Sequence, residues 1–416
     1  MNLTTLGQQA RHAFKYISLA SGETRRKTVL AIADQLESGF DEVRAANEKD
    51  IQLAQAGGMT PALIDRLTLT ETRLQGLVAD VRALATLPDP IGETFDTRTL
   101  PNGLRIHRQR VPLGVMGVIY ESRPNVTVDV AALAIKTGNA ALLRGGKETI
   151  HSNVALIHLI HAALCESGLP AEVIQFIDDP DRELIAEMLR LNDYIDVIIP
   201  RGGNGLHQFC RKNATIPVIT GGIGICHLFV DETADLDAAL PVIFNAKTQR
   251  PSVCNSLDTV LVHEKVAAEF LPRVVEHLAP AGVTFRAEPT AAALVNHPTV
   301  SPAGPEDFDT EWLALILGLK VVPGLDAALE HINTHSTFHS DGILTHTQSN
   351  AERFIREVDS AAVFVNASTR FNDGGQLGLG AEVAVSTQRL HARGPMGLPE
   401  LTTYKWVVVG DYTVRG

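Results

Sequence analysis

Apolar residues recur at helical spacing in the N-terminal part of the chain. Between Leu74 and Leu84 they stand three or four positions apart, which predicts an amphipathic helix with Thr70 as its N-cap. Pro88 follows and ends this helix, because proline has no backbone N–H to donate. We therefore expect residues 1–92 to be largely helical.

From Val111 onward, strand and helix patterns alternate, which predicts βα units around a mostly parallel sheet. Short apolar runs are predicted as buried strands, and the segments between them as helices. The predicted strands cover 115–120, 140–143, 173–177, 195–199 and 217–220, and the predicted helices cover 126–135, 152–164, 182–191 and 206–211. A second series runs from Asp231 to about Val365. The predicted fold class is therefore α/β.

Two β-prone pieces lie outside these series. Asn102-Gly103 stands between two charged β-prone segments and predicts a tight hairpin that lacks an apolar face of its own. Near the C-terminus, the apolar run from Trp406 to Val409 is too long for an exposed strand edge. A lone ribbon is marginal in water, so we expect residues 93–111 and 400–416 to form an oligomerisation arm covered by a second copy of the chain.

Composition and charge narrow the class of protein. A chain of 416 residues with 45% hydrophobic and 20% charged residues is typical of a globular protein of two to three domains. A net charge of -12 argues against nucleic acid as the main partner. No signal peptide and no apolar run of about 20 residues is expected. Four cysteines without a CxxC pair favour a reducing compartment, most simply the cytoplasm.

One cysteine stands out from the other three. Cys254 falls in a polar loop between a predicted helix and a predicted strand, beside Lys247 and Arg250. Nearby cations favour the nucleophilic thiolate by lowering the thiol pKa, although a small buried side chain is the alternative. The remaining cysteines, Cys165, Cys210 and Cys226, lie in apolar segments and are interpreted as core residues.

Three glycine-containing turns are candidates for a cofactor site. The turn at 143–148 follows a strand, and its Arg144 and Lys147 would suit the 2′-phosphate of NADP. A second turn contains Gly202, Gly203 and Asn204 but lacks the GxGxxG spacing, so a purely structural turn is equally compatible. The third turn contains Thr220 and Gly221, where a simple bulge is the alternative.

Three histidines four residues apart, His331, His335 and His339, invite comparison with metal ligands. The helix that contains the first is expected to end near Asn333, so the three would not share one face. We therefore expect no metal site.

Four long motifs resemble the gamma-glutamyl phosphate reductase family, a branch of the aldehyde dehydrogenase superfamily. They cover residues 118–127, 248–255, 367–382 and 390–397. The resemblance implies two doubly wound αβα domains plus a β-hairpin oligomerisation arm. It places the cofactor-binding domain at 1–92 and 112–230 and the catalytic domain at 231–380. It also implies reduction of L-glutamyl 5-phosphate by NADPH in proline biosynthesis, and transient contact with glutamate 5-kinase.

The resemblance further implies roles for single residues. Cys254 would attack the acyl phosphate, while the side chain of Asn125 and the backbone N–H of Cys254 would stabilise the oxyanion. An N-cap role is the alternative for Asn125. Glu311 would bind the nicotinamide ribose, or else be a solvated residue at the start of a helix. At Ile219–Gly222 the chain lacks the glutamate that activates water in oxidising relatives, which favours phosphate-linked chemistry.

Substrate binding would fall mainly to arginines within the motifs. Arg123, Arg250 and Arg370 can each bind a carboxylate or a phosphate, and each can equally be a structural ion-pair partner. Ser368, Thr369 and Glu382 complete the set implied by the resemblance, with Glu382 as one candidate for the substrate ammonium. Alternative functions are a thiol hydrolase or acyltransferase, a non-catalytic scaffold, and an aldehyde dehydrogenase for another small substrate.

Overall fold

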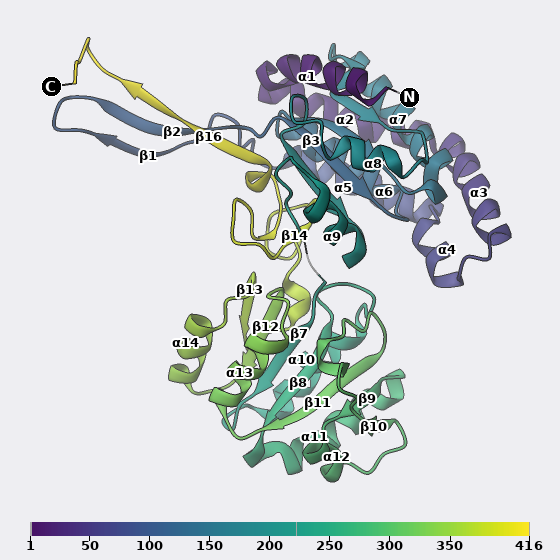
Figure 1. The fold of residues 1–416 in the computed structure, drawn as a ribbon, viewed down its shortest axis with the longest axis vertical. Coiled ribbons are helices and arrows are strands. Elements are labelled where there is room, and N and C mark those ends of the chain that lie inside the picture. Colours follow the sequence, from purple (N-terminus) through teal and green to yellow (C-terminus); the bar gives the residue numbers. More distant parts are fainter. Residues whose placement is uncertain (1, 222, 416) are drawn as a thin grey trace. The chain divides into compact units, whose positions relative to one another are not determined.

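The computed structural model describes residues 2–221 and 223–415 and divides the chain into two compact units (Figure 1). The first unit contains the chain up to Thr220, together with Gly378–Ala384 and the chain from Met396 onward. The second contains Gly221–Leu377 and Val385–Pro395. In the described part of the chain, no helix has both the length and the apolar composition needed to cross a bilayer.

The first unit is built on a parallel sheet in the order β5-β4-β3-β6. Its strands are β3 (Val115–Tyr120), β4 (Ala140–Arg144), β5 (Ile174–Phe176) and β6 (Val197–Arg201). The helices are α1 (Leu3–Leu19), α2 (Gly22–Ser38), α3 (Phe40–Ala56), α4 (Pro61–Leu67), α5 (Glu71–Thr86), α6 (Asn125–Lys136), α7 (Ile150–Glu166), α8 (Glu183–Met188) and α9 (Asn204–Asn213). Residues of α1, α8 and α9 share one apolar cluster with the sheet.

Two local predictions for this unit meet different outcomes. Thr70 caps α5 as expected, since its hydroxyl oxygen accepts a hydrogen bond from the Arg73 backbone N–H. The predicted strand at 217–220 is wrong, because that segment makes only an isolated bridge between Val218 and Ile198. Pro217 has no backbone N–H to donate to a neighbouring strand, so this apolar run does not form a regular strand.

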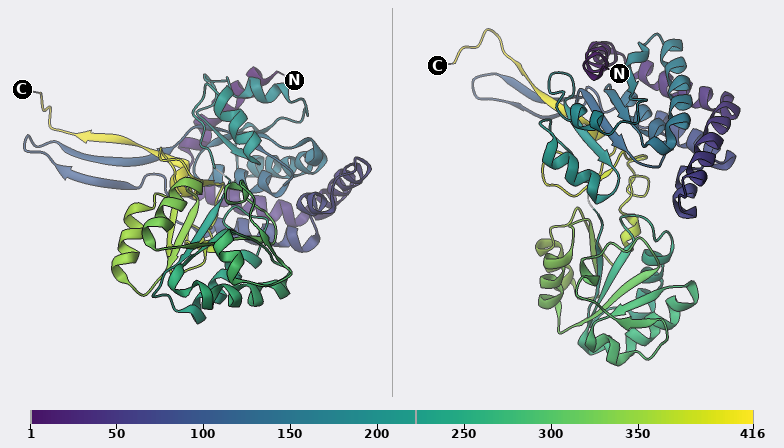
Figure 2. Two further views of the ribbon diagram at one scale, coloured as in Figure 1. Left: turned by 60° about the horizontal axis from the view of Figure 1, so that its bottom comes forward. Right: turned by 45° about the vertical axis from the view of Figure 1, so that its right-hand side comes forward.

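A three-stranded antiparallel ribbon extends from the rest of the first unit (Figure 2). Its order is β1-β2-β16, from Thr94–Thr99, Arg105–Pro112 and Thr402–Val409. The hairpin turn differs from a two-residue Asn-Gly loop: Gly103, at φ 86°, donates its N–H to Leu100 O. Pro101 fixes the second position of this wider turn. The Arg108 guanidinium lies over the Trp406 ring.

The second unit contains a seven-stranded parallel sheet in the order β10-β9-β11-β8-β7-β12-β13. The strands are β7 (Cys226–Val230), β8 (Leu257–His263), β9 (Thr284–Ala287), β10 (Val300–Pro302), β11 (Ile316–Val322), β12 (Ser340–Leu344) and β13 (Ala362–Val365). The helices are α10 (Leu236–Thr248), α11 (Glu264–Leu278), α12 (Pro289–Leu294), α13 (Leu325–His335) and α14 (Gln348–Glu357). Since β7 belongs to this sheet, the expected domain boundary at residue 230 falls too late.

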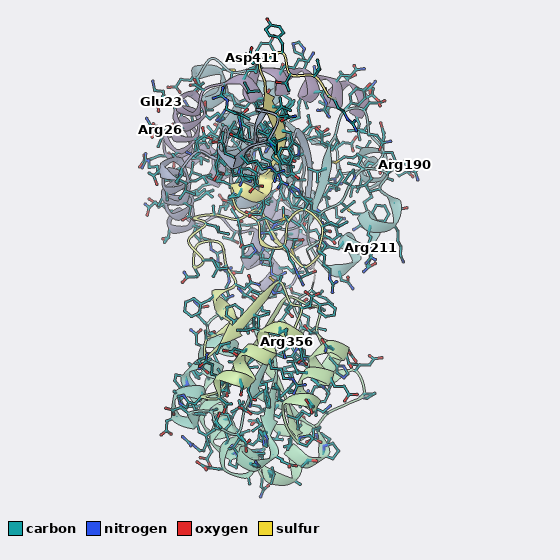
Figure 3. The ribbon with its side chains drawn as sticks, turned by 90° about the vertical axis from the view of Figure 1, so that its left-hand side faces the viewer. Glu23, Arg26, Arg190, Arg211, Arg356 and Asp411 are labelled. Carbon is teal, nitrogen blue, oxygen red and sulfur yellow. The ribbon has the colours of Figure 1, made fainter. Side chains whose placement is uncertain are left out.

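Apolar clusters on both faces of this sheet explain its nearly continuous hydrophobic strands. Leu228 and Val260 pack with α10, α11 and α12, whereas their neighbours Phe229 and Leu261 pack with α13 and α14. A short ribbon of β14 (Val385–Ser386) and β15 (Gly394–Pro395) also belongs to the second unit. Arg356 on α14 is an exposed charged side chain of this unit (Figure 3).

Candidate active site

The predicted site residues fall in both units, and each set is described within its own unit. In the second unit, Cys254 is partly exposed in the loop between α10 and β8, where the sequence predicted it. The buried Cys226 Sγ donates a hydrogen bond to the Cys254 backbone carbonyl at 3.2 Å. Burial raises the pKa of Cys226 well above its ordinary value, so this residue stays a protonated donor. Sequence reasoning missed this contact and treated Cys226 as core filling.

Gly224 lies directly against the same carbonyl group. A Cβ atom at this position would lie 1.6 Å from Cys254 O, so only glycine fits. The Gly224 N–H donates to Glu311 Oε1 at 2.9 Å. The loop that carries Cys254 and the segment that carries Glu311 are thus connected through one glycine residue. Gly222, in the same turn, lies outside the described residues.

Glu311 does not begin a helix, contrary to the second alternative considered for it. It lies in an irregular segment between the short 3-10 helix Asp307–Asp309 and β11. Burial raises the pKa of Glu311, while the hydrogen bond from Gly224 partly opposes this rise. A carboxylate held in this way, with one oxygen engaged by Gly224, can still accept a hydrogen bond from a sugar hydroxyl.

A buried ion pair supports the loop and the Glu311 segment together. Lys247 Nζ donates to Leu257 O at 2.8 Å and lies 3.5 Å from Asp258 Oδ1. Asp258 also accepts from the backbone N–H groups of Cys226 and Trp312. Burial raises the pKa of Asp258 to about 6, although Lys247 opposes the shift. The direct partners of Lys247 are therefore Leu257 and Asp258, which the sequence did not reveal.

The segment with Ser368, Thr369 and Arg370 is attached to the loop that carries Cys254. Thr369 Oγ1 donates to Asn255 O at 2.8 Å, and Asn255 Nδ2 donates to Asn372 O at 3.0 Å. Ser368 Oγ accepts a hydrogen bond from the Arg370 backbone N–H. The structure thus brings the predicted residues of this segment next to Cys254 in the second unit.

In the first unit, Asn125 is the first residue of α6, and Pro124 occupies the N-cap position without a side-chain cap. The N-cap alternative for Asn125 is therefore wrong. Its Nδ2 instead donates to Asp129 Oδ2 at 2.9 Å, one helical turn later. Burial raises the pKa of Asp129 to about 6, and the hydrogen bond from Asn125 opposes that rise. Asp129 fixes the amide, whose second N–H remains available to a ligand.

The two cations of the first glycine turn have different surroundings. The buried Arg144 guanidinium donates to the carbonyl oxygens of Gly145 and Pro180, so it ties two loops together. Burial also lowers the pKa of Arg144. Lys147, in contrast, is exposed at the start of the 3-10 helix Lys147–Thr149. Of the two, Lys147 is the one that is accessible from solvent.

Acidic side chains that sequence reasoning missed lie at two of these turns. Glu148 Oε1 accepts from both the backbone N–H and the hydroxyl of Ser122, whose φ is 45°. Glu121 Oε2 accepts from the Gly203 N–H at 3.0 Å, at the start of α9. A Cβ on Gly202 would lie 2.4 Å from the same carboxylate oxygen. The turn with Gly202, Gly203 and Asn204 is thus already bound to a carboxylate.

For the remaining predicted residues, the structure gives a backbone contact or the unit to which they belong. Arg123 accepts a backbone hydrogen bond from Val126, which helps to begin α6. Thr220 ends the first unit, Gly221 begins the second and bridges Ser386, and Glu382 belongs to the segment that returns to the first unit.

Two of the three histidines, His331 and His335, lie on helix α13. Helix α13 extends to His335, two residues beyond its expected end, and the rings of His331 and His335 lie 4.3 Å apart. His335 pairs with Asp309. Within residues 2–221 and 223–415, no group of three or more potential metal ligands is found.

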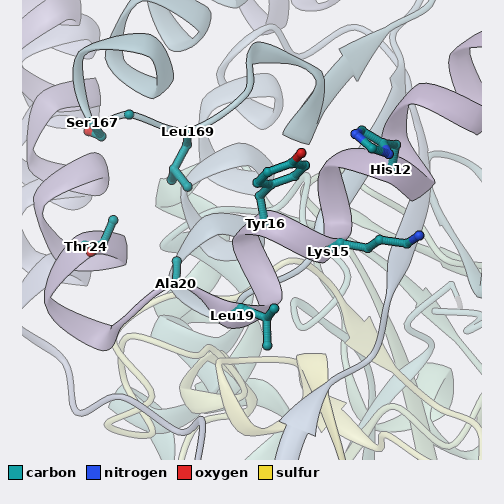
Figure 4. A pocket seen from close by; sticks show the side chains of 9 residues that line it. His12, Lys15, Tyr16, Leu19, Ala20, Thr24, Ser167 and Leu169 are labelled. Atoms are coloured by element: carbon teal, nitrogen blue, oxygen red, sulfur yellow. The ribbon is translucent and has the colours of Figure 1, made fainter.

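A surface hollow in the first unit is lined by residues of α1 and of the turn after α7, among them His12, Tyr16 and Leu169 (Figure 4). It includes none of the predicted site residues.

The fold and the cysteine loop agree with a match to the model of the aldehyde dehydrogenase family over residues 3–301. Two curated relatives called gamma-glutamyl phosphate reductase are similar over their whole length. The protein from Aeromonas salmonicida is 57% identical and covers 100% of both chains. The protein from Roseiflexus castenholzii is 58% identical over 100% of this chain and 99% of its own.

A solved structure agrees with these relatives. The crystal structure of gamma-glutamyl phosphate reductase from Thermotoga maritima matches with a TM-score of 0.97 and 48% identity, covering 100% of both chains. The chain therefore belongs to the gamma-glutamyl phosphate reductases of the aldehyde dehydrogenase family.

Proposed function

We propose that the protein reduces L-glutamyl 5-phosphate to L-glutamate 5-semialdehyde and phosphate with NADPH, through a thioester on Cys254. This is the second step of proline biosynthesis from glutamate. The observation that carries the proposal is the partly exposed Cys254, whose backbone carbonyl accepts a hydrogen bond from the buried Cys226 thiol. The chain that contains it is 57% identical to a gamma-glutamyl phosphate reductase.

The chemistry begins with attack of the Cys254 thiolate on the acyl carbon. A C–S bond forms, the C–O bond to phosphate breaks, and phosphate leaves. The Cys226 and Gly224 contacts restrict rotation about the Cys254 backbone, which keeps its sulfur and its N–H in one arrangement. We assign the oxyanion to that N–H and to the Asn125 amide, which Asp129 orients.

When bound, NADPH would supply the hydride for reduction of the thioester to the aldehyde, with return of the Cys254 thiolate. The surroundings of Lys147 and Glu311 fit such a cofactor, because one offers an exposed cation and the other a fixed carboxylate. We assign Lys147 to the 2′-phosphate and Glu311 to the nicotinamide ribose. Arg144, engaged by carbonyl groups, would support the turn.

Water is a competitor for the thioester, since its attack would give glutamate instead of the aldehyde. The segment Ile219-Thr220-Gly221 carries no carboxylate that could activate water. Phosphate is then the partner with which the thioester exchanges. We assign Arg123, Arg250 and Glu382 to the charged groups at the amino-acid end of the substrate.

Assembly into a homo-oligomer is the role we propose for the β1-β2-β16 ribbon. Trp406 and Val408 on β16 are 45% and 57% exposed, which is unusual for large apolar side chains on an outer strand. Pairing with a second copy would cover them. Transient contact with glutamate 5-kinase and a cytoplasmic location stay predictions.

The reverse reaction tests this function. With glutamate 5-semialdehyde and NADP+, the rate of NADPH formation should rise from zero with added phosphate, and the product should be the acyl phosphate, trapped with hydroxylamine. An equal rate without phosphate, with glutamate as product, would instead identify an aldehyde-oxidising enzyme. No NADPH under any condition would favour a thiol hydrolase or acyltransferase.

A further inference from the structure

Arg370 is held across the two ends of the loop that carries Cys254. Its Nε donates to Gln249 Oε1 at 2.7 Å, at the start of that loop. Its neighbour Thr369 donates to Asn255 O at 2.8 Å, directly after Cys254. Arg370 thus has a fixed position relative to the nucleophile, set by contacts within one unit.

The charge of Arg370 is not neutralised by an ion pair within residues 2–221 and 223–415, although the Asp373 carboxylate acts on it through space. Its guanidinium is partly buried, and within the described part of the chain it forms no ion pair. The Gln249 amide that holds it is neutral. Burial lowers the pKa of Arg370, and the nearby Arg250 adds to this, while Asp373 and Cys254 oppose it. Such a cation is a receptor for an anionic ligand, because desolvation strengthens its attraction to a negative charge.

We propose that Arg370 binds the phosphoryl group of the substrate and that Gln249 is the positioning residue that orients its guanidinium. This assignment rests on the proposed function. The phosphate is attached to the very carbon that Cys254 attacks, whereas the substrate carboxylate lies at the far end of the glutamyl chain. Arg370 is bound to one end of the Cys254 loop, and its neighbour Thr369 is bound to the other, so we assign the phosphate to Arg370.

The hydrogen-bond geometry suits that role. Since Nε is occupied by Gln249, the two terminal nitrogens remain as a planar fork, which matches two phosphate oxygens. Negative charge on the phosphate increases as its C–O bond breaks, so the same contact stabilises the departing group. In the reverse direction a phosphate oxygen attacks the thioester carbon, and the C–S bond breaks to return the Cys254 thiolate.

Reverse-direction kinetics with two varied substrates separate the phosphate from the aldehyde. For Arg370→Gln we expect the KM for inorganic phosphate to rise roughly 10- to 100-fold, because the variant loses a hydrogen bond between two charged groups. The KM for glutamate 5-semialdehyde should stay within about twofold. Arg370→Lys, which keeps the charge without the fork, should fall in between. Gln249→Ala should raise only the phosphate KM, by a smaller factor.

Arg356→Gln is the matched control, since Arg356 is an exposed arginine on α14 of the same unit (Figure 3). It should leave both constants unchanged. A rise in the aldehyde KM with an unchanged phosphate KM in Arg370→Gln would overturn the assignment and give Arg370 to the substrate carboxylate. If Arg370→Gln does not fold, Arg370→Lys decides by the same criterion. Failure of the proposed function differs, because the wild-type protein itself would then show no phosphate dependence.

Discussion

The thiol of Cys226 donates a hydrogen bond to the backbone carbonyl of Cys254, 3.2 Å away. Cys226 begins β7, and Cys254 lies in the loop before β8, its neighbour in the sheet. The same carbonyl lies against Gly224, which in turn binds Glu311. Burial keeps the Cys226 thiol protonated, so it remains a donor to the backbone of the partly exposed Cys254.

Removing the Cys226 donor should affect the chemical step more than substrate binding. We expect Cys226→Ala to lower kcat several-fold with little change in KM, because a neutral hydrogen bond contributes about 1 kcal/mol. Cys226→Ser keeps a donor and should retain most of the activity. Steady-state kinetics of the two variants test this prediction. If Cys226→Ala were as active as Cys226→Ser, the hydrogen bond would not contribute to activity.

The two cations of the 143–148 turn should behave differently on substitution. Lys147→Gln is expected to raise the Kd for NADPH about tenfold or more while leaving the Kd for NADH nearly unchanged, since only NADPH has a 2′-phosphate. Arg144→Gln should lower the melting temperature, because it removes the donors to the carbonyl groups of Gly145 and Pro180. Fluorescence titration measures both Kd values, and equal weakening of both cofactors by Lys147→Gln would exclude the assignment.

Glu311→Gln should weaken cofactor binding and disturb the nucleophile loop together. The amide keeps an oxygen for Gly224 but loses the negative charge that favours a ribose hydroxyl. We expect the Kd for NADPH to rise several-fold and kcat to fall. Glu306→Gln, at a nearby exposed glutamate, is the control and should change neither. Unchanged NADPH affinity in Glu311→Gln would assign Glu311 a structural role only.

His331 should make the protein less stable as the pH falls. Burial, with His227, Lys320 and His335 nearby, lowers the pKa of His331 to about 2 in the folded state. In the unfolded chain a histidine binds its proton near pH 6.5. Below that pH, proton binding therefore stabilises the unfolded state relative to the folded state. The free energy of unfolding should therefore decrease by about 1.4 kcal/mol per pH unit from this residue alone.

His331→Phe keeps an aromatic ring but removes the proton, so it should flatten that slope between pH 5 and 6.5. Urea unfolding at several pH values gives the slopes. His158→Gln, at an exposed histidine on α7, serves as the control and should leave the slope near that of the wild type. A His331→Phe slope equal to that of the wild type would contradict the explanation.

The sequence predicted the structure best where the conformation of a segment depends on neighbouring residues in the chain. The buried strand at 115–120, the cap at Thr70 and the loop with Cys254 follow from local patterns and agree with the structure. The long motifs identified the family, which the relatives bear out.

Contacts between distant segments could not be read from local patterns. The sequence predicts Arg144 as a phosphate ligand but gives no sign of its hydrogen bond to Pro180 O, 36 residues away. The ion pair of Lys247 with Asp258, at 3.5 Å, joins residues eleven positions apart and has no local sequence pattern. Cys226 appeared to be an ordinary core residue because its partner is a backbone carbonyl, which leaves no signature in side-chain spacing.

A single-turnover experiment tests the central claim, that a Cys254 thioester exchanges with phosphate and not with water. Enzyme, NADP+ and glutamate 5-semialdehyde are mixed in phosphate-free buffer. We predict a burst of about one NADPH per active site, then no further turnover until phosphate is added, and no burst in Cys254→Ser. Continuous NADPH formation without phosphate, or a full burst in Cys254→Ser, would contradict the account.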